Sequence, residues 1–375
     1  MRLCLGLLVL LASGQARTQE CPSIAEYDEI VAVVTQRFFD QTFNGLNWAE
    51  RVRHYRDRID CAADADRVAS TINSLLEELD ASHTALYTRQ DVHYWGLNSL
   101  FAEDGAYETD FSGIWPEREG GRWFVKHVLE GSPAAKVGVR VGDELLAIAG
   151  EEFSPLGFGP GVSTLGLSSD GRIVRTVSLE TRRQSVMRGF VDAARASERI
   201  ISVGSKRIGY FHLWTARDAI LESMEAALER FENDRVDALV MDYRGGYGGT
   251  SEDYLTTLRE SAFWRAVPKY FLIDDSVRSG KEMLTGIIKR DGLGILVGSK
   301  TAGYFLGASP FRFFDDKYLL LLAVGGGGAL PGIGRIEGVG IEPDIVVEPC
   351  RRYCAGRDPI LEKTIELIEA ASSDA

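Results

Sequence analysis

Ser279 stands in a segment, Asp275–Glu282, where a strand is expected to end and a helix to begin. A serine at a helix N-terminus lies in a positive local potential, and neighbouring backbone N–H groups can hold a developing oxyanion. This setting suits a nucleophilic hydroxyl. Glu282, three residues later, completes a capping-box pattern in which the serine only caps the helix. Both interpretations stay open, and the local pattern favours the cap.

A glycine-rich run, Asp242-Tyr243-Arg244-Gly245-Gly246-Tyr247-Gly248-Gly249, follows a segment that is expected to be a buried strand. Glycine lets the backbone approach a ligand closely and turn its N–H groups toward that ligand. A phosphate-binding loop is one interpretation, but the Walker pattern with its Lys-Ser/Thr pair is absent. An oxyanion hole is the second interpretation, and an ordinary turn is the third.

His83 is expected on a loop at the end of a helical segment. Apolar residues recur at helical spacing from Asp64 to Leu79, and Asp80-Ala81-Ser82-His83-Thr84 then ends the helix. The imidazole is therefore free to face away from the helical core. The remaining histidines have no matching partners in the sequence and are interpreted as surface or packing residues; they are His54, His93, His127 and His212.

Three parts must position these groups. Residues 20–95 are predicted to form an N-terminal helical domain that carries Ser82 and His83, and residues 100–190 a small β domain. From residue 195 to 349, strands and helices alternate, which predicts an α/β core with a mostly parallel sheet covered by helices. Residues 350–375 are expected to form a loop and a final helix. The expected core strands are Ile208–Leu213, Ala238–Asp242, Lys269–Ile273, Ile295–Val297 and Tyr318–Val324.

The stretch Gly131–Gly150 strongly resembles part of a PDZ domain. A Ser-Pro-Ala-Ala turn opens a short helix, and Gly-Asp-Glu-Leu-Leu leads into a strand that ends at a turn glycine. PDZ domains bind extended peptides beside a sheet edge, often capturing a free C-terminus on backbone N–H groups. The resemblance implies that Gly113, Ile114 and Trp115 lie in the peptide-binding loop.

The order of the pieces resembles the carboxy-terminal processing protease and tricorn-core family of serine peptidases. The resemblance covers nearly the whole chain after its first residues. It rests on the PDZ-like module, the Asp-x-Arg-Gly segment, and the tail Gly338-Val339-Gly340-Ile341-Glu342-Pro343-Asp344. It implies a crotonase-like ββα spiral for the core and makes Ser279 the nucleophile. The lysine base of one branch of the family falls at Tyr304 here, and Lys300 is a poor substitute.

The other branch uses a Ser-His-Glu arrangement, and this sequence matches it. The resemblance implies that His83 takes the proton from Ser279, that Ser82 helps to orient it, and that Glu337 holds or stabilises the imidazole. It also implies an oxyanion hole built from the N–H of Gly280 and that of Gly245 or Gly246. Asp242 and Arg244 are interpreted as a structural ion pair.

Charge and composition limit the partners. The 375 residues carry a formal net charge of −13, which argues against a nucleic-acid partner or an anionic-membrane surface. After the first residues no segment is long and apolar enough to span a bilayer. The expected partner is a peptide or an unfolded protein, and no cofactor or metal is called for.

The first residues and the cysteines both suggest export. Residues 1–19 show a short charged start, an apolar run and a small-residue exit, which predicts a secretory signal and a periplasmic or extracellular protein. Four cysteines follow, and three disulfide connectivities are possible. The expected pairs are Cys21–Cys61 and Cys350–Cys354, whereas the spacing suits zinc poorly.

The sequence thus predicts a secreted or periplasmic serine endopeptidase that acts through Ser279, His83 and Glu337. Its PDZ domain would recognise peptides or gate the active site. The alternative is a catalytically inactive peptide- or ligand-binding protein on the same fold, favoured by the missing base lysine and by the unusual approach Asp274–Arg278 to the serine.

Overall fold

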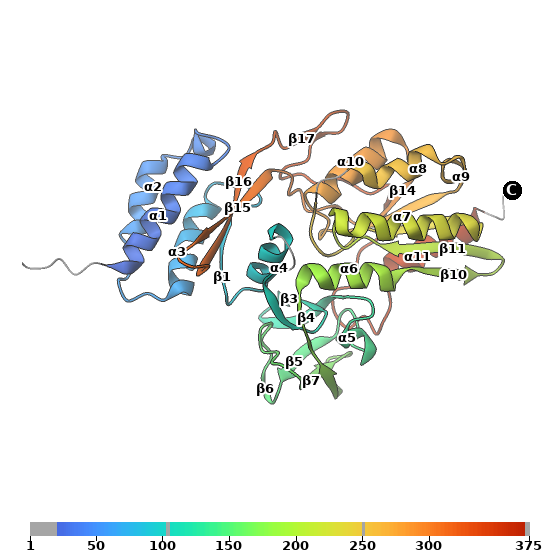
Figure 1. Cartoon of the computed structure of the whole chain (residues 1–375), viewed down its shortest axis with the longest axis horizontal. Helices are drawn as coiled ribbons and strands as arrows, with labels where there is room; N and C mark the ends of the chain where they lie inside the picture. The colour runs from blue at the N-terminus through green and yellow to red at the C-terminus, as the bar shows by residue number, and fades with distance from the viewer. Residues whose placement is uncertain (1–20, 103–105, 250–251, 372–375) are drawn as a thin grey trace, which may run out of the picture.

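The structure is a computed structural model that describes residues 21–102, 106–249 and 252–371. Figure 1 shows three parts: a helical N-terminal part, an α/β core at the opposite end, and a β-rich part that projects below both. The predicted signal segment, residues 1–19, lies outside the described residues.

The N-terminal part is built from both halves of the chain. Its helices are α1 (Pro22–Arg37), η1 (Phe43–Gly45), α2 (Trp48–Arg56) and α3 (Ala65–Glu77). They pack on a three-stranded antiparallel sheet of β1 (Ala85–Thr88), β16 (Tyr318–Gly325) and β15 (Gly307–Phe313). Tyr318–Val324 is thus a strand, as predicted, but it pairs with β1 and β15 instead of joining the parallel sheet.

The β-rich part is an antiparallel sheet with the strand order β3-β4-β5-β7-β8 and a short helix, α5, beside it. Its elements are β3 (Ile114–Glu119), β4 (Arg122–Val128), α5 (Pro133–Lys136), β5 (Glu144–Ile148), β6 (Glu151–Glu152), β7 (Val162–Ser168) and β8 (Val174–Glu180). A strand pair connects it to the rest, β2 (Glu108–Phe111) with β9 (Arg182–Ser185), and both strands contact α4 (Val92–Phe101) and α6 (Val186–Ser197).

The core sheet is mostly parallel, as predicted. Its order is β10 (Arg199–Val203), β11 (Lys206–His212), β12 (Ala238–Asp242), β13 (Lys269–Ile273), β14 (Ile295–Gly298) and β19 (Ile345–Val346), and only the β10–β11 pair is antiparallel. The remaining core elements are α7 (Asp218–Asn233), η2 (Glu252–Leu255), α8 (Thr256–Glu260), α9 (Ala262–Ala266), α10 (Gly280–Asp291), β17 (Ala329–Leu330), β18 (Gly334–Arg335) and α11 (Pro359–Ala370).

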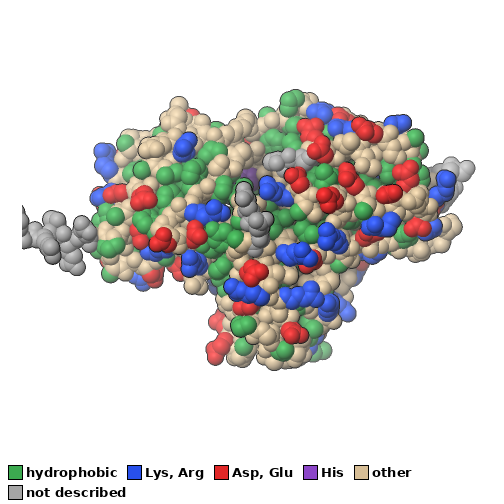
Figure 2. All heavy atoms as spheres, viewed as in Figure 1, with side chains coloured by type: hydrophobic (Ala, Val, Ile, Leu, Met, Phe, Trp, Pro, Cys, Tyr) green, Lys and Arg blue, Asp and Glu red, His purple; other side chains and the backbone are tan. Residues whose placement is uncertain are grey.

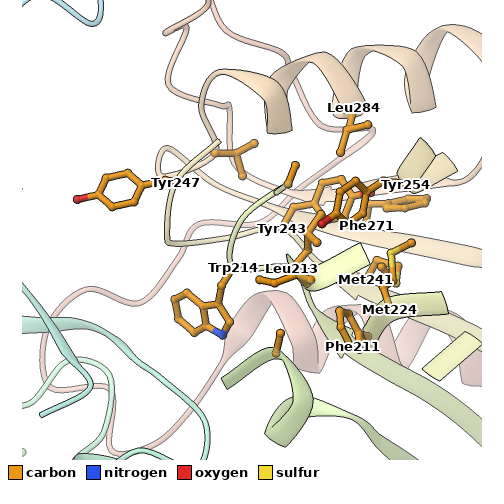
Figure 3. Packing of buried hydrophobic residues seen from close by; sticks show 14 of the residues in the cluster. Phe211, Leu213, Trp214, Met224, Met241, Tyr243, Tyr247, Tyr254, Phe271 and Leu284 are labelled. Atoms are coloured by element: carbon orange, nitrogen blue, oxygen red, sulfur yellow. The ribbon is translucent and has the colours of Figure 1, made fainter. Parts of the chain in front are cut away.

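Alternate residues of the core strands face opposite layers. Phe211 and Met241 pack with α7 and α10 on one face, whereas Tyr210 and Val240 pack with α11 on the other. Figure 3 shows the first of these layers, in which aromatic and aliphatic side chains from strands and helices interlock. Both faces of the sheet are therefore buried, and the loops after β12 and β13 leave it at the same edge.

Two disulfides close the ends of the molecule. Cys21 is bonded to Cys61 across the N-terminal helices, and Cys350 is bonded to Cys354 ahead of α11. These are the two expected pairs, and they fit an exported protein because disulfides persist in oxidising compartments. In the described part of the chain, no helix is long and apolar enough to cross a membrane.

Candidate active site

Ser279 lies on a sharp turn between β13 and α10. Its backbone dihedrals are φ 56° and ψ −130°, a region that L-residues rarely adopt. Its side chain makes no capping hydrogen bond to the helix, so the local preference for a cap was wrong. A serine held on a strained strand-to-helix turn, with its hydroxyl unused by the helix, is the arrangement of a nucleophile elbow.

Glu282 anchors the segment that faces Ser279. Its buried carboxylate accepts hydrogen bonds from Thr301 Oγ1 at 2.6 Å, Gly303 N at 2.7 Å and Tyr304 N at 2.8 Å. Burial raises the pKa of this carboxyl group, against these hydrogen bonds. Ser279 N in turn donates to Tyr304 O at 2.8 Å. The residue that suggested a capping box therefore fixes the wall of the site.

Ser82 connects His83 to Glu337. Ser82 Oγ donates to Glu337 Oε2 at 2.8 Å and lies 3.2 Å from His83 Nδ1, while Ser82 N donates to Glu337 Oε1 at 2.9 Å. Because the serine proton goes to the carboxylate, the imidazole must donate its own Nδ1 proton to Ser82 Oγ. In that tautomer Nε2 carries the lone pair that a general base needs, and the backbone of Leu306 also hydrogen-bonds the ring.

The remaining contacts of Glu337 hold the carboxylate in place. Its Oε2 also accepts hydrogen bonds from the backbone N–H groups of Phe305 and Leu306, at 2.8 and 3.1 Å. The Ser82–Glu337 bond joins groups 255 residues apart, so it connects the N-terminal part to the core.

His83 and Ser279 line the same cavity, of about 400 Å³. Figure 2 shows a hollow between the N-terminal part and the core, in which a histidine side chain is visible. Within the described ranges no hydrogen bond joins Ser279 Oγ to His83. His83 and Ser279 are therefore neighbours in one cavity without a hydrogen bond between them.

The charge state of His83 is set by its surroundings. Burial and, to a lesser extent, the nearby Arg278 guanidinium lower its pKa to about 4, although Glu337 and a hydrogen bond to the backbone of Leu306 oppose them. The imidazole is therefore neutral at pH 7, as a base must be before it takes a proton.

In the glycine-rich loop after β12, Gly248 lies next to Ser279, whereas Gly245 and Gly246 were the expected neighbours. Gly245 N donates to Ser276 Oγ at 2.6 Å, and a Cβ on Gly246 would lie 1.9 Å from the carbonyl oxygen of Trp214. A Cβ on Gly248, by contrast, would lie 2.6 Å from Ser279 Cβ and 2.9 Å from Gly280 N. Gly245 N is thus engaged away from Ser279, which argues against it as an oxyanion donor, whereas Gly248 lies beside Ser279 together with Gly280.

A buried cation fixes the shape of this loop. Lys281 is fully buried, and its Nζ donates to Tyr243 O at 2.9 Å and to Gly245 O. Burial lowers the pKa of this lysine to about 7. The expected ion pair of Asp242 and Arg244 is present at 2.5 Å, and Asp358 extends it toward α11.

Tyr304, which stands at the sequence position of the base lysine in the Ser-Lys branch, lines the cavity. Its ring centroid is 6.1 Å from that of His83, and the side chain is 45% exposed. Lys300 instead forms an ion pair with Glu342 at 2.7 Å, so it does not serve as a base. Among the described residues, no group of three His, Cys, Asp or Glu side chains could hold a metal ion.

Three cavity residues were missed from the sequence. His93, set aside as a packing residue, lines the cavity and has its Nδ1 3.2 Å from Tyr247 OH. Arg217 and Arg278 line it as well. For Arg278, its position beside the candidate nucleophile was a signal in the sequence. His93 and Arg217 had none, because single polar residues form no periodic pattern.

The predicted peptide-binding residues line a second cavity, of about 390 Å³, in the PDZ-like part. Gly113, Ile114 and Trp115 all contribute to it. The Trp115 ring also contacts Tyr247, with 5.4 Å between ring centroids, and it lies 6.0 Å from His93. Trp115 is therefore shared between the PDZ-like cavity and the wall of the active-site cavity.

A serine on a strained turn, and a histidine linked through Ser82 to the half-buried carboxylate of Glu337, form an arrangement typical of the serine hydrolase class. Residues 254–347 match the model of peptidase family S41, and residues 124–159 match that of a PDZ domain. The chain therefore contains segments that match an S41 peptidase and a PDZ domain, and it is similar to carboxyl-terminal processing and tricorn proteases.

Two curated relatives illustrate this similarity. The chain is 25% identical to the "Putative tricorn protease homolog 2" of Streptomyces coelicolor, over 91% of this chain but only 32% of that protein. It therefore spans about a third of the tricorn relatives' length. It is 22% identical to the chloroplastic "Carboxyl-terminal-processing peptidase 3" of Arabidopsis thaliana, over 84% of this chain and 67% of the relative.

A solved structure shares the fold. The photosystem II D1 C-terminal processing protease superposes with a TM-score of 0.56 at 18% identity, covering 87% of this chain and 93% of that one. At this level of identity the likeness concerns the fold.

Proposed function

We propose that this protein is an exported serine endopeptidase in which Ser279 is the nucleophile and His83 is the general base. The observation that carries the proposal is the hydrogen-bonded line from Glu337 through Ser82 to His83, which ends in the cavity that Ser279 lines. Relatives whose names describe proteases support it.

The chemistry follows from the geometry. Ser279 Oγ attacks the peptide carbonyl carbon while its proton passes to His83 Nε2, and the imidazolium is stabilised through Ser82 by Glu337. The N–H groups of Gly280 and Gly248 hold the oxyanion. His83 then gives the proton to the leaving amine, and water hydrolyses the acyl-enzyme by the same exchange.

The PDZ domain supplies peptide recognition in this proposal. An extended segment would bind in the cavity beside Gly113 and Ile114. Trp115 lines this cavity and contacts Tyr247, which lines the active-site cavity. Peptide binding in the PDZ domain would therefore shift the position of Tyr247.

The proposal is tested by cleavage of a reduced and alkylated, unfolded protein, followed by mass spectrometry. Ser279→Ala should lower the rate by about 10⁴-fold or more, because the nucleophile is lost. Ser299→Ala, which changes a serine that does not line the cavity, is the matched control. Retained hydrolysis by Ser279→Ala would refute the assignment.

One observation favours a second function, an inactive peptide binder. Ser279 and His83 make no hydrogen bond within the described ranges, although catalytic hydrogen bonds often tighten only when substrate binds. A binder would retain unfolded peptide without cutting it, and Ser279 would not react with a fluorophosphonate at any pH.

A further inference from the structure

Among the residues that the structure describes, two arginines and no acidic side chain line the active-site cavity. Arg278 directly precedes Ser279, and Arg217 lies at the residue before α7. The two histidines of the cavity have lowered pKa values, chiefly because they are buried, and are neutral at pH 7. The cavity lining thus carries two positive charges in a chain whose net charge is −13.

Neither arginine is neutralised within the described part of the chain. Arg278 makes one hydrogen bond, from Nε to the carbonyl oxygen of Ser276 at 3.3 Å, and its guanidinium lies 5.7 Å from the Tyr304 ring centroid. No carboxylate forms an ion pair with Arg278 or Arg217 among the described residues. Since a guanidinium has five N–H donors, most of the donors of both side chains remain available.

Both arginines are held in place by their backbones. Tyr254 OH donates to Arg217 O at 2.6 Å, and Lys281 N donates to Arg278 O at 3.2 Å. Arg278 is half-buried and Arg217 is exposed. Arg278 therefore lies beside Ser279, and Arg217 lies nearer to solvent. This arrangement suits a peptide substrate that enters the cavity from the solvent.

The apolar lining of the cavity favours some anionic ligands over others. Most of its wall is apolar or aromatic, formed by Tyr87, Leu97, Leu100, Phe101, Tyr247 and Leu321. Arginine binds planar carboxylates with paired N–H donors, and its weak hydration suits partly buried sites. A ligand that carries a carboxylate next to an apolar side chain matches both properties, and peptides supply such a group.

We propose that Arg278, assisted by Arg217, binds a carboxylate of the peptide substrate close to the bond that is cleaved. The proposal rests on the peptidase function argued above and adds a substrate class to it. The carboxylate belongs either to an acidic side chain or to the free C-terminus of the peptide, and both present the same group to the guanidinium.

The experiment uses mixtures of synthetic decapeptides with acetylated N-termini and either free or amidated C-termini. Cleavage sites are mapped by mass spectrometry, and kcat/KM is then measured for the best sequence. An acidic side chain as the source predicts Asp or Glu enriched at one position near the cut in both mixtures. A C-terminal source predicts cuts at a fixed short distance from the end, with free carboxylates only.

Arg278→Gln should remove the preference. For the best carboxylate peptide, kcat/KM should fall by roughly 10- to 100-fold, since a charge-assisted hydrogen bond is lost. The neutral analogue should change little, and Arg278→Lys should recover part of the loss. Arg195→Gln, which changes an exposed arginine outside the cavity, is the control and should leave both rates unchanged.

Two outcomes would overturn the proposal: wild-type protein that cleaves neutral and carboxylate peptides equally, or an Arg278→Gln variant that loses both equally. Fluorophosphonate labelling of Ser279 in Arg278→Gln checks that the site is intact. Failure of the peptidase function is distinct, because the wild-type protein would then cleave nothing and Ser279 would remain unlabelled.

Discussion

The imidazole of His83 lies between two opposite charges. Arg278 disfavours its protonation, while Glu337, acting through Ser82, favours it. Burial is the main cause of the low pKa of His83 and Arg278 adds to it, so the histidine starts neutral and gains its proton only when a negative charge develops on the substrate. A hydrogen bond from Nδ1 to the Ser82 hydroxyl favours the tautomer in which Nε2 is the basic nitrogen.

The pH profile tests this balance. Because His83 must be neutral, kcat/KM should stay high in mild acid and fall only as the pH drops through its pKa of about 4. Glu337→Gln removes the charge that raises this pKa, so the acid limb should move to lower pH. Arg278→Gln removes a charge that lowers it, so the limb should move to higher pH.

The two variants should also differ in rate at neutral pH. Glu337→Gln should lower kcat by about 100-fold or more, because the imidazolium loses its stabilising charge. Movement of both acid limbs in the same direction would contradict the account. The readout is kcat/KM against pH on a single peptide substrate.

Single residues could be predicted unequally from the sequence. The local sequence around Ser279 and Glu282 favoured a helix cap over a nucleophile, and only the dihedral angles of Ser279 and the hydrogen bonds of Glu282 reverse that preference. No sequence pattern pointed to Arg278 or Arg217 as binding residues. Their proposed role depends on the lack of an ion-pair partner in the folded structure, which the sequence does not show.

The loops after β12 and β13 form one polar unit behind the nucleophile. Ser276 Oγ accepts a hydrogen bond from Gly245 N and donates to the buried carboxylate of Asp274. Lys281 ties the carbonyl oxygens of the glycine-rich loop to α10. These contacts leave Gly248 against Ser279, so the loop can present an N–H group without needing flexibility.

Gly248→Ala tests the proposed oxyanion-binding loop. The added Cβ would lie 2.6 Å from Ser279 Cβ, so either the loop or the serine must move. We expect kcat to fall by about 100-fold, the usual effect of losing one oxyanion donor, with the protein still folded by circular dichroism. Gly325→Ala, where a Cβ would meet nothing within 4 Å, is the control. Wild-type kcat in Gly248→Ala would contradict the assignment.

Elements were predictable where periodicity was clear, but their partners were not. The apolar run Tyr318–Val324 reads equally well as a strand of a parallel core sheet or of an antiparallel sheet. Its pairing with β1 depends on the α1–α3 layer that covers it, which is a long-range contact that no local pattern encodes.

At the scale of the molecule, the site exists only where three parts meet. The N-terminal part supplies His83, the core supplies Ser279, and Trp115 of the PDZ-like part packs against Tyr247, which lines the cavity. A further polar contact joins PDZ and core, because Glu130 bonds His212 Nδ1 and Trp214 Nε1, each at 2.8 Å. Spacing alone could not show that these distant segments form one site. Only the resemblance to a known family predicted it from the sequence.

The Cys21–Cys61 disulfide should stabilise the part that carries His83. It closes a loop with a sequence separation of 40, so replacing both cysteines by serine should cost about 3 to 4 kcal/mol. The Cys350–Cys354 bond, with a separation of 4, should contribute less. Thermal unfolding of the two double variants measures the difference, and equal losses would contradict the argument.

The central claim is that His83 activates Ser279, and labelling by a fluorophosphonate probe measures this directly. The probe should attach to Ser279 in the wild-type protein, as located by peptide mass spectrometry. The rate should fall by about 100-fold or more in His83→Ala, since the base is gone, and labelling should disappear in Ser279→Ala. His54→Ala, a histidine outside the cavity, should label at the wild-type rate. Labelling of Ser279 at equal rates with and without His83, or no labelling of the wild-type protein, would contradict the account.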